Sequence, residues 1–457
     1  MPLQKNQVLT LRVERLSSDG SGVAHSPDGE TVFVPGAAPG DEARVRIVKD
    51  CKRYAFGILD EVLTPSPDRI PVDCAVAGPC GGCSLRHLDY AAELRAKQEN
   101  VADAFARIGG LDVPVLPIVG SPEVNRYRNK VQFPVGVDKS GKPCFGFYAG
   151  RTHRIVPCPD CRLQPGVLNE IGNALCAFFA EKGIQPYSEE TGKGLVRHIF
   201  LRRGAHSGQI MVCLVCTCAK LPYAEELCTR LKAQFAEITT ILLNVNAKNT
   251  NVILGTETHT LYGPGYIEDT LCGVPVQLGP LSFYQVNTLA AEQLYGIAAQ
   301  YAQLTPDDLL LDLYCGMGTI GLSMAAHCRE LIGVEIVPEA IESAKANAAR
   351  MGADVAAKSR FFCADAGQAA TRLAAEGLHP DIVMLDPPRK GCDEATLSAV
   401  VRMAPRRVVY VSCNPATAAR DAAWLEQNGY HAEKVQPVDL FPRTRHVEAI
   451  VSLQRGI

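Results

Sequence analysis

A cysteine and a glutamate near the end of the 457-residue chain have the surroundings of reactive side chains. Cys413 follows the apolar run RVVYV in RVVYVSCNPAT, at the carboxyl end of an expected strand, where open α/β sheets keep their active sites. A thiolate there can act as a covalent nucleophile. Glu448 enters the apolar segment VEAIVSL, where burial would raise its pKa and suit it to accept a proton. His446, on the same face of that strand, is the alternative base.

A glycine-rich segment, DLYCGMGTIGL at 312–322, follows an apolar run and precedes an expected helix. A strand, such a turn and a helix form a nucleoside pocket, because glycine lets a ligand approach the backbone closely. The pattern D-x-x-C-G-x-G differs from the G-x-G-x-x-G of nicotinamide-binding folds and favours S-adenosylmethionine. Glu335 ends the next expected strand, where a carboxylate can bind both ribose hydroxyls, and Asp365 ends the third, beside the adenine.

The segment DPPRKG at 386–391 ends a fourth expected strand. Two prolines can simply stiffen a turn, but in methyltransferases this position faces the transferred methyl group. Enzymes that methylate amines commonly carry an aromatic residue after the prolines, which stacks on the target base. Arg389 stands there in this chain and disfavours that chemistry.

Carbon 5 of uracil is a substrate that these residues would suit. It is a poor nucleophile, and a thiolate that adds to C6 turns the ring into an enolate whose C5 can attack a methyl group. The C5 proton must then leave to a base. A plain buried cysteine is the competing interpretation of Cys413. The polar SCNP turn and the position beyond DPPR argue against it.

The motifs QVN, DLYCGMGTIGL, DPPRKG, VYVSCNP and DLFPRTRHVE occur in this order and resemble those of the bacterial RNA (uracil-5-)-methyltransferase family. The resemblance covers essentially the whole chain. It implies Cys413 as the nucleophile and Glu448 as the proton acceptor, with His446 in a supporting role. It also implies contacts to S-adenosylmethionine from Gln285, Tyr314, Glu335, Asp365 and Asp386.

Four of the eighteen cysteines form a separate candidate site. Cys74, Cys80 and Cys83 give the spacing C-x5-C-G-G-C, and Cys161 lies far downstream. Such thiolates can hold zinc or a [4Fe–4S] cluster, and spacing alone does not separate the two. The resemblance implies a [4Fe–4S] cluster and selects Cys161 over Cys158. We expect the cluster to stabilise the central domain rather than to transfer electrons, because methyl transfer needs no redox step.

The segment RYRNKVQFPVG at 126–136 is a candidate RNA contact. Arg126, Arg128 and Lys130 could bind phosphates, and the tyrosine between them could stack on a base, although a solvated basic face has the same composition. The target uracil must leave its stack to reach Cys413. Single-stranded loops are therefore the expected targets.

Three domains are expected to position these residues. Residues 1–63 read as short strands in an OB-like barrel and resemble the TRAM domain, an RNA-binding module. Residues 64–280 form a central α+β iron–sulfur and RNA-binding domain, with a helix at 89–109 that is a candidate for packing on the catalytic domain. Residues 281–457 repeat strand, turn and helix, which predicts a Rossmann-like class I methyltransferase domain in an α/β fold.

The composition indicates a cytoplasmic protein. With 46 basic and 49 acidic residues the net charge is −3, so a basic coat over the whole surface is excluded while a local basic face is not. The sequence has no signal peptide and no apolar run long enough to span a membrane. No obligate protein partner is evident.

Two other activities compete with methylation of uracil. One is methylation of an amine, which Arg389 and the Cys413–Glu448 pair disfavour. The other is an RNA-binding iron–sulfur protein without this methyl transfer, including the radical enzymes whose ligands are spaced C-x3-C-x2-C. The first gap here is five residues. Among RNAs, the cysteines and the TRAM-like region favour 23S ribosomal RNA, and the T-loop of transfer RNA is the alternative.

Overall fold

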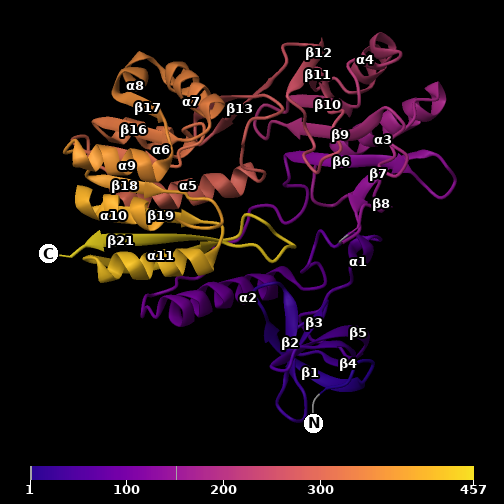
Figure 1. The fold of residues 1–457 in the computed structure, drawn as a ribbon, viewed down its shortest axis with the longest axis horizontal. Coiled ribbons are helices and arrows are strands. Elements are labelled where there is room, and N and C mark those ends of the chain that lie inside the picture. Colours follow the sequence, from indigo (N-terminus) through magenta and orange to yellow (C-terminus); the bar gives the residue numbers. More distant parts are fainter. Residues whose placement is uncertain (1–2, 151, 457) are drawn as a thin grey trace.

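The computed structural model describes residues 3–150 and 152–456, which form a barrel, a central sheet and a catalytic sheet (Figure 1). Within those ranges no helix has the length and apolar character needed to cross a membrane.

The N-terminal strands close into a five-stranded barrel in the order β1-β2-β3-β5-β4, which confirms the expected OB-like fold. Alternate side chains of each strand point into the barrel and form its apolar interior. In β4 the side chains of Ala43, Val45 and Ile47 are buried in the barrel, whereas Arg44 and Arg46 face outward. The strands are β1 (Val8–Leu16), β2 (Ser21–His25), β3 (Thr31–Pro35), β4 (Glu42–Asp50) and β5 (Tyr54–Thr64).

A seven-stranded sheet in the order β12-β11-β10-β9-β6-β7-β8 forms the central region. Cys213 and Cys216 in β10 are buried in different hydrophobic clusters, because residues an odd number of positions apart in a strand face opposite sides of the sheet. Helices α3 (Gly166–Lys182) and α4 (Ala224–Gln234) pack on this sheet. The strands are β6 (Lys130–Val137), β7 (Pro143–Tyr148), β8 (Ile155–Pro157), β9 (Val196–Arg203), β10 (Ile210–Cys216), β11 (Ile238–Val245) and β12 (Glu257–Tyr262).

The catalytic sheet has the order β17-β16-β15-β18-β19-β21-β20, and it confirms the predicted class I methyltransferase fold. Its first five strands are parallel, whereas β21 runs antiparallel between β19 and β20. The sequence did not predict β20, because it is an edge strand with the charged residues Glu433 and Lys434 and the proline Pro437. The strands are β15 (Leu309–Leu313), β16 (Glu330–Glu335), β17 (Ser359–Cys363), β18 (Ile382–Leu385), β19 (Arg407–Ser412), β20 (Tyr430–Val438) and β21 (Glu448–Arg455).

Helices flank both faces of the catalytic sheet (Figure 1). A hairpin that precedes residue 281 also belongs to its core, since the buried apolar side chains of both hairpin strands join the cluster formed by α5 and α6. The elements are β13 (Ile267–Leu271), β14 (Val274–Leu278), α5 (Thr288–Ala302), α6 (Thr319–Met324), η2 (Ala325–His327), α7 (Pro338–Met351), α8 (Ala353–Lys358), α9 (Ala366–Ala375), α10 (Glu394–Met403) and α11 (Pro415–Gln427).

The helix expected at 89–109 is present as α2 (Tyr90–Asp103), which continues into the π-helical turn η1 (Ala104–Gly109). Asp89 caps its start by accepting a hydrogen bond from the Ala92 amide at 2.8 Å, and Gly110 ends it with a φ of 63°. Figure 1 shows α2 between the barrel and the catalytic domain, where η1 packs on α11. The short helix α1 (Ala77–Cys80) lies among the candidate cluster ligands.

Candidate active site

Cys413 and Glu448 are brought together by the register of β19 and β21. The antiparallel pairing sets Ser412 opposite Ala449. Cys413 directly follows Ser412 at the end of β19, and Glu448 directly precedes Ala449 at the start of β21. The next pair in this antiparallel register is therefore Cys413 opposite Glu448, at the end of the sheet. The predicted nucleophile and the predicted base are therefore neighbours.

Two loops enclose this pair. In the SCNP turn, Asn414 caps α11 with its side-chain oxygen and donates from Nδ2 to the Arg389 carbonyl at 3.0 Å. Thr417 Oγ1 also donates to that carbonyl, at 3.4 Å. The DPPRKG loop turns tightly through a bond from the Gly391 amide to the Pro388 carbonyl. Arg389 is thereby fixed beside the thiol of Cys413, to which it donates a hydrogen bond.

The charges at the site favour Glu448 over His446 as the proton acceptor. Burial, reinforced by the nearby Asp386, raises the pKa of Glu448 to about 8, which suits a base near neutral pH. Burial and the surrounding cations lower the pKa of His446 to about 4, which makes its imidazole a weak base. For Cys413, burial and then Glu448 and Asp386 raise the pKa of the thiol, while Arg389 opposes that rise.

The glycine-rich turn after β15 leaves its backbone open to a ligand. Tyr314 and Gly316 have positive φ angles of 67° and 55°, and a side chain added at Gly316 would meet no atom within 4 Å. Glu335, at the end of β16, accepts hydrogen bonds from the amides of Gly316 at 3.2 Å and Val337 at 3.0 Å. The turn and the ribose-binding candidate are thus held in one rigid unit.

Asp312 is buried near Glu335 and Asp386, whereas Asp365 is partly exposed. Asp312 accepts from the Gly321 amide at 3.0 Å through one oxygen, and its other oxygen is buried without a hydrogen-bond partner. Burial raises the pKa of Asp312 to about 8 and that of Asp386 to about 7. Asp365 caps α9 through the Gln368 amide, at 3.1 Å.

Gln285 connects this pocket to the central region. Its carbonyl accepts from Asn129 Nδ2 at 2.7 Å, and its side chain contacts the buried hydroxyl of Tyr295. Tyr295 also lies near Thr319 and Asp386. Gln285 and Asp386, two of the predicted donor contacts, therefore both lie near Tyr295.

Two exposed apolar side chains lie next to predicted donor contacts in the sequence but were not predicted to take part. Ile336, which directly follows Glu335, is 61% exposed, and Phe283, two residues before Gln285, is 70% exposed. Flat apolar or aromatic surfaces of this kind can pack on an adenine or stack on a base. The only sequence signal was their position beside predicted contacts.

Basic side chains gather outside the reactive pair. Arg128, Arg389, Arg445 and Lys97 all lie close enough to His446 to lower its pKa. Arg128 has a buried Nε without a hydrogen-bond partner. Phosphates are natural partners for such unpaired guanidinium groups.

The other two predicted RNA contacts differ in setting from Arg128. Burial, together with Arg202 and Arg128, lowers the pKa of Lys130 to about 8. Arg126 donates to the carbonyls of Cys161 at 2.8 Å and Gln164 at 3.2 Å, and to Asp160. Its guanidinium is occupied in holding the loop that carries Cys161.

The predicted cluster ligands come from separate segments of the chain and lie in the same region. Cys74, Cys80, Cys83 and Cys161 lie close enough to influence one another's ionisation, and Cys158 shares a hydrogen bond with Cys161. The Gly82 amide donates to the Cys80 sulfur. Over residues 3–150 and 152–456, no three histidine, cysteine or acidic side chains are grouped closely enough to hold a single metal ion.

Arg86 is a buried charged group that interacts with one of these thiols, and it was not predicted from the sequence. It is 2% exposed, donates to Asp73 at 2.7 Å and Asn125 at 3.0 Å, and contacts the Cys83 sulfur. Its Nε and Nη2 atoms are buried without a hydrogen-bond partner. A buried cation with two spare donors fits a site that carries excess negative charge, as a cluster bound by four thiolates does.

Comparison with known proteins places these features in a family. Residues 276–456 match the tRNA (uracil-5-)-methyltransferase family, and residues 2–59 match the TRAM domain. An RNA methyltransferase of Halalkalibacterium halodurans is 42% identical over 454 residues, which cover 99% of this chain and 98% of that protein. One from Clostridium tetani is 41% identical over 451 residues, with coverage of 99% and 97%.

A solved structure is similar over nearly the whole length. The tRNA (uracil-54, C5)-methyltransferase of Pyrococcus abyssi, in complex with S-adenosyl-L-homocysteine, is 26% identical and superposes with a TM-score of 0.77 over 98% of this chain and 100% of that one. The chain therefore belongs to the RNA (uracil-5-)-methyltransferase family and is an S-adenosylmethionine-dependent RNA methyltransferase with an N-terminal TRAM domain.

Proposed function

We propose that this enzyme methylates C5 of a uridine in RNA through a covalent adduct between Cys413 and C6 of the uracil, with Glu448 as the base. The observation that carries the proposal is the opposed position of these two residues at the end of β19 and β21. A cysteine and a carboxylate with a raised pKa are the two groups that this reaction needs.

Side chains of the enzyme would form and break the bond to C6 and accept the C5 proton. The Cys413 thiolate, stabilised by Arg389, forms a bond to C6 and moves the electron pair of the C5–C6 double bond toward C5. S-adenosylmethionine, when bound, would supply the methyl group to C5, with cleavage of its sulfur–methyl bond and departure of S-adenosylhomocysteine. Glu448 then accepts the C5 proton. The bond between sulfur and C6 breaks, the C5–C6 double bond returns, and the thiolate leaves.

The donor would be bound by Gln285, Tyr314, Glu335, Asp365 and Asp386. Glu335 has the position for the ribose, and Asp386 lies nearest to the reactive pair. The pocket suits a sulfonium cation because Asp312 has an unpartnered oxygen and several carboxylates raise one another's pKa.

The RNA would be bound by the TRAM barrel (1–63), by the central domain (64–280) through Arg128, Lys130 and Arg126, and by the catalytic domain (281–457). The unpaired Nε of Arg128 supports a phosphate contact. For Arg126 we propose an indirect role, since its donors are engaged with the loop of Cys161. We infer 23S ribosomal RNA as the target and the cytoplasm as the place of action, with the tRNA T-loop as the alternative substrate.

We also infer that Cys74, Cys80, Cys83 and Cys161 hold a [4Fe–4S] cluster. The buried Arg86 and the amide donor to Cys80 support a thiolate-rich group at this place. A cluster there would supply a rigid link among segments that are far apart in the sequence. Anaerobic purification followed by iron, sulfide and zinc analysis tests this inference. Four iron and four sulfide per chain support it, and stoichiometric zinc without sulfide contradicts it.

A covalent trap tests the methylation chemistry. RNA that contains 5-fluorouridine should give a stable protein–RNA adduct with S-adenosylmethionine, because the fluorine at C5 cannot leave as a proton does. Cys413→Ala should give none. Absence of an adduct with the wild-type enzyme on both ribosomal and transfer RNA would rule out the proposed mechanism. Mapping of 5-methyluridine in RNA from cells that lack the enzyme then identifies the nucleotide.

A further inference from the structure

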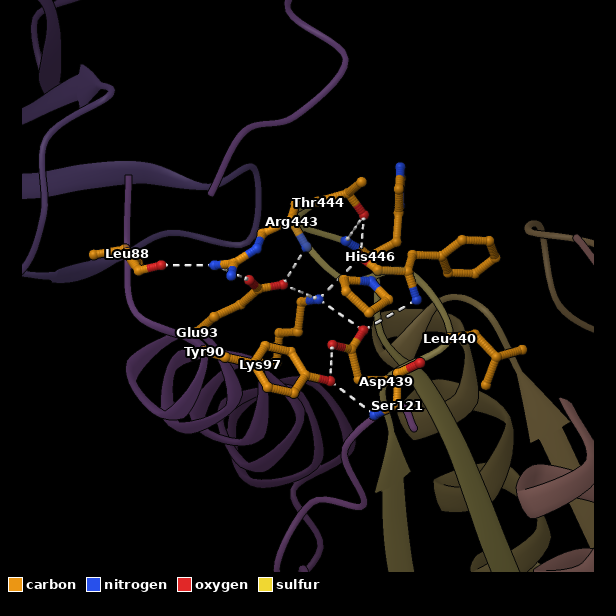
Figure 2. A network of polar contacts seen from close by, with 12 residues as sticks. Leu88, Tyr90, Glu93, Lys97, Ser121, Asp439, Leu440, Arg443, Thr444 and His446 are labelled. Atoms are coloured by element: carbon orange, nitrogen blue, oxygen red, sulfur yellow. Dashed lines mark hydrogen bonds and ion pairs between the residues drawn. The ribbon is translucent and has the colours of Figure 1, made fainter. Parts of the chain in front are cut away.

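A buried group of charges joins helix α2 to the loop that precedes Glu448. This loop, residues 439–447, connects β20 to β21 and carries His446. Figure 2 shows the Lys97 side chain extending from α2 to a point between Glu93 and Asp439. The side chains of all three residues are essentially inaccessible to solvent.

Lys97 uses all three of its donors in this place. Its Nζ donates to Glu93 Oε1 at 2.7 Å, to Asp439 Oδ1 at 2.8 Å and to the Phe441 carbonyl at 3.1 Å. Two of these three acceptors belong to the loop. Because a lysine has three donors and no acceptor, its hydrogen bonding is complete without water or substrate.

Further bonds fix both ends of the connection. Tyr90 donates to the other oxygen of Asp439 at 2.9 Å and accepts from the Ser121 amide at 2.7 Å. Glu93 accepts from the Arg443 amide at 2.7 Å. Arg443 in turn donates to the Leu88 carbonyl at 2.7 Å, just before α2 begins (Figure 2).

The buried group of charges lies next to the residue that pairs with Glu448. Val438 pairs with Glu448 across β20 and β21, and Asp439 is the residue directly after Val438. The bond from Lys97 to Asp439 therefore fixes the backbone beside the cross-strand partner of Glu448. On the opposite side, Asn287 of the QVN motif donates to the Leu440 carbonyl at 3.0 Å, which ties the loop to the donor pocket.

Burial of three charges needs a reason beyond stability, because replacement of such a group by apolar side chains often costs a protein nothing. A reacting carboxylate, in contrast, gains from being held in one place, since a displacement of about 1 Å can cost about 100-fold in rate. We propose that Lys97 is a positioning residue that sets Glu448 opposite Cys413 and thereby acts on removal of the C5 proton. This inference rests on the proposed function.

Two measurements on full-length enzyme separate that role from a general structural one. Adduct formation with 5-fluorouridine RNA reports the attack of Cys413 and methyl transfer without proton removal. Release of tritium from RNA labelled at C5 of uracil requires the base. Lys97→Met should slow tritium release about 10-fold or more and leave adduct formation within about threefold of wild type.

Two further variants keep the test decisive. Tyr90→Phe removes one bond to Asp439 without unbalancing buried charge, and it should shift the two rates in the same direction by a smaller factor. It replaces Lys97→Met if thermal melting shows that the latter does not fold. Arg95→Met is the matched control, because it removes an exposed cation from α2 that pairs with Asp68 at the surface, and both rates should stay at the wild-type value.

Equal slowing of both steps, or slowing of neither, would overturn the proposal. Absence of an adduct with wild-type enzyme would instead contradict the proposed function, so the two failures are distinct.

Discussion

The two halves of the active site carry opposite charge. The inner pocket, formed by Asp312, Glu335, Asp386 and Glu448, is acidic, and three of these carboxyl groups have raised pKa values. The outer rim, formed by Arg128, Arg389 and Arg445, is basic, and these cations together with burial lower the pKa of His446. Cys413 lies at the border, with carboxylates on one side and Arg389 on the other.

This difference matches the two substrates of the proposed reaction. The sulfonium of the methyl donor is a cation, and the RNA backbone is a polyanion. The acidic inner pocket suits the cation and the basic rim suits the polyanion, and Cys413 interacts with groups of both kinds. The net charge of −3 for the whole chain conceals this separation, because it averages the two halves.

Removal of the base from the inner pocket should have the largest effect. Glu448→Gln should still form the covalent adduct but should slow release of methylated RNA by about 100-fold to 10,000-fold, the usual contribution of a general base. In the wild-type enzyme, release should accelerate with rising pH up to about 8, because only the ionised carboxylate accepts the proton and burial raises its pKa to about 8. Denaturing gels measure the covalent adduct, and single-turnover kinetics measure the rate at which methylated RNA is released.

The matched control for that variant is Glu376→Gln, which changes an exposed carboxylate of the same domain. It should behave as wild type. Fast turnover by Glu448→Gln would assign proton removal to another group.

Removal of the cation at the border should have the next largest effect. Arg389→Gln should slow adduct formation about 10-fold to 100-fold. The Cys413 thiolate loses its charged hydrogen bond, while the carboxylates of Glu448 and Asp386, which disfavour the thiolate, remain. The loss should shrink as the pH rises, since more thiol then ionises without the arginine. A loss that does not change with pH would mean that Arg389 acts on the RNA instead.

Protonation of the inner pocket should control the choice between the methyl donor and its product. Burial raises the pKa of Asp386 to about 7, and a bound cation favours the ionised carboxylate, so cation binding releases a proton and strengthens as the pH rises. Between about pH 6 and about pH 8, S-adenosylmethionine should gain up to about tenfold in affinity over S-adenosylhomocysteine, whose sulfur is neutral. Calorimetric titration measures the ratio, and Asp386→Asn should reduce its pH dependence, because Asp312 still titrates near pH 8.

Loss of one rim cation should have the smallest effect. Arg128→Gln should weaken RNA binding several-fold, and the slope of log affinity against log salt should fall by about 1, because one phosphate contact is lost. Arg230→Gln is the control, since Glu181 and Glu226 already neutralise that guanidinium. Equal slopes for wild type and Arg128→Gln would remove Arg128 from the RNA interface.

Local patterns predicted the fold and the positions of the reactive residues. The barrel and the parallel strands follow from apolar runs separated by turns, and Cys413 and Asp386 each end such a run. These features are encoded within short segments, so a single sequence reveals them.

Contacts between distant segments could not be predicted in the same way. Lys97 and Asp439 are separated by 342 residues, and nothing near Lys97 in the sequence marks it as a buried cation. Arg86 was missed for a related reason, because its unpartnered atoms become visible only when the cysteine segments meet. Burial of a long polar side chain depends on tertiary packing, which local spacing does not report.

The order of strands in the catalytic sheet also affects how the enzyme matures. β21 is made after every other strand of that sheet, yet it lies between β19 and β20. While the chain emerges from the ribosome, β20 cannot reach its final place until β21 has followed it. The pairing of β19 with β21, which sets Cys413 opposite Glu448, therefore forms only after synthesis has reached the last strand of the sheet.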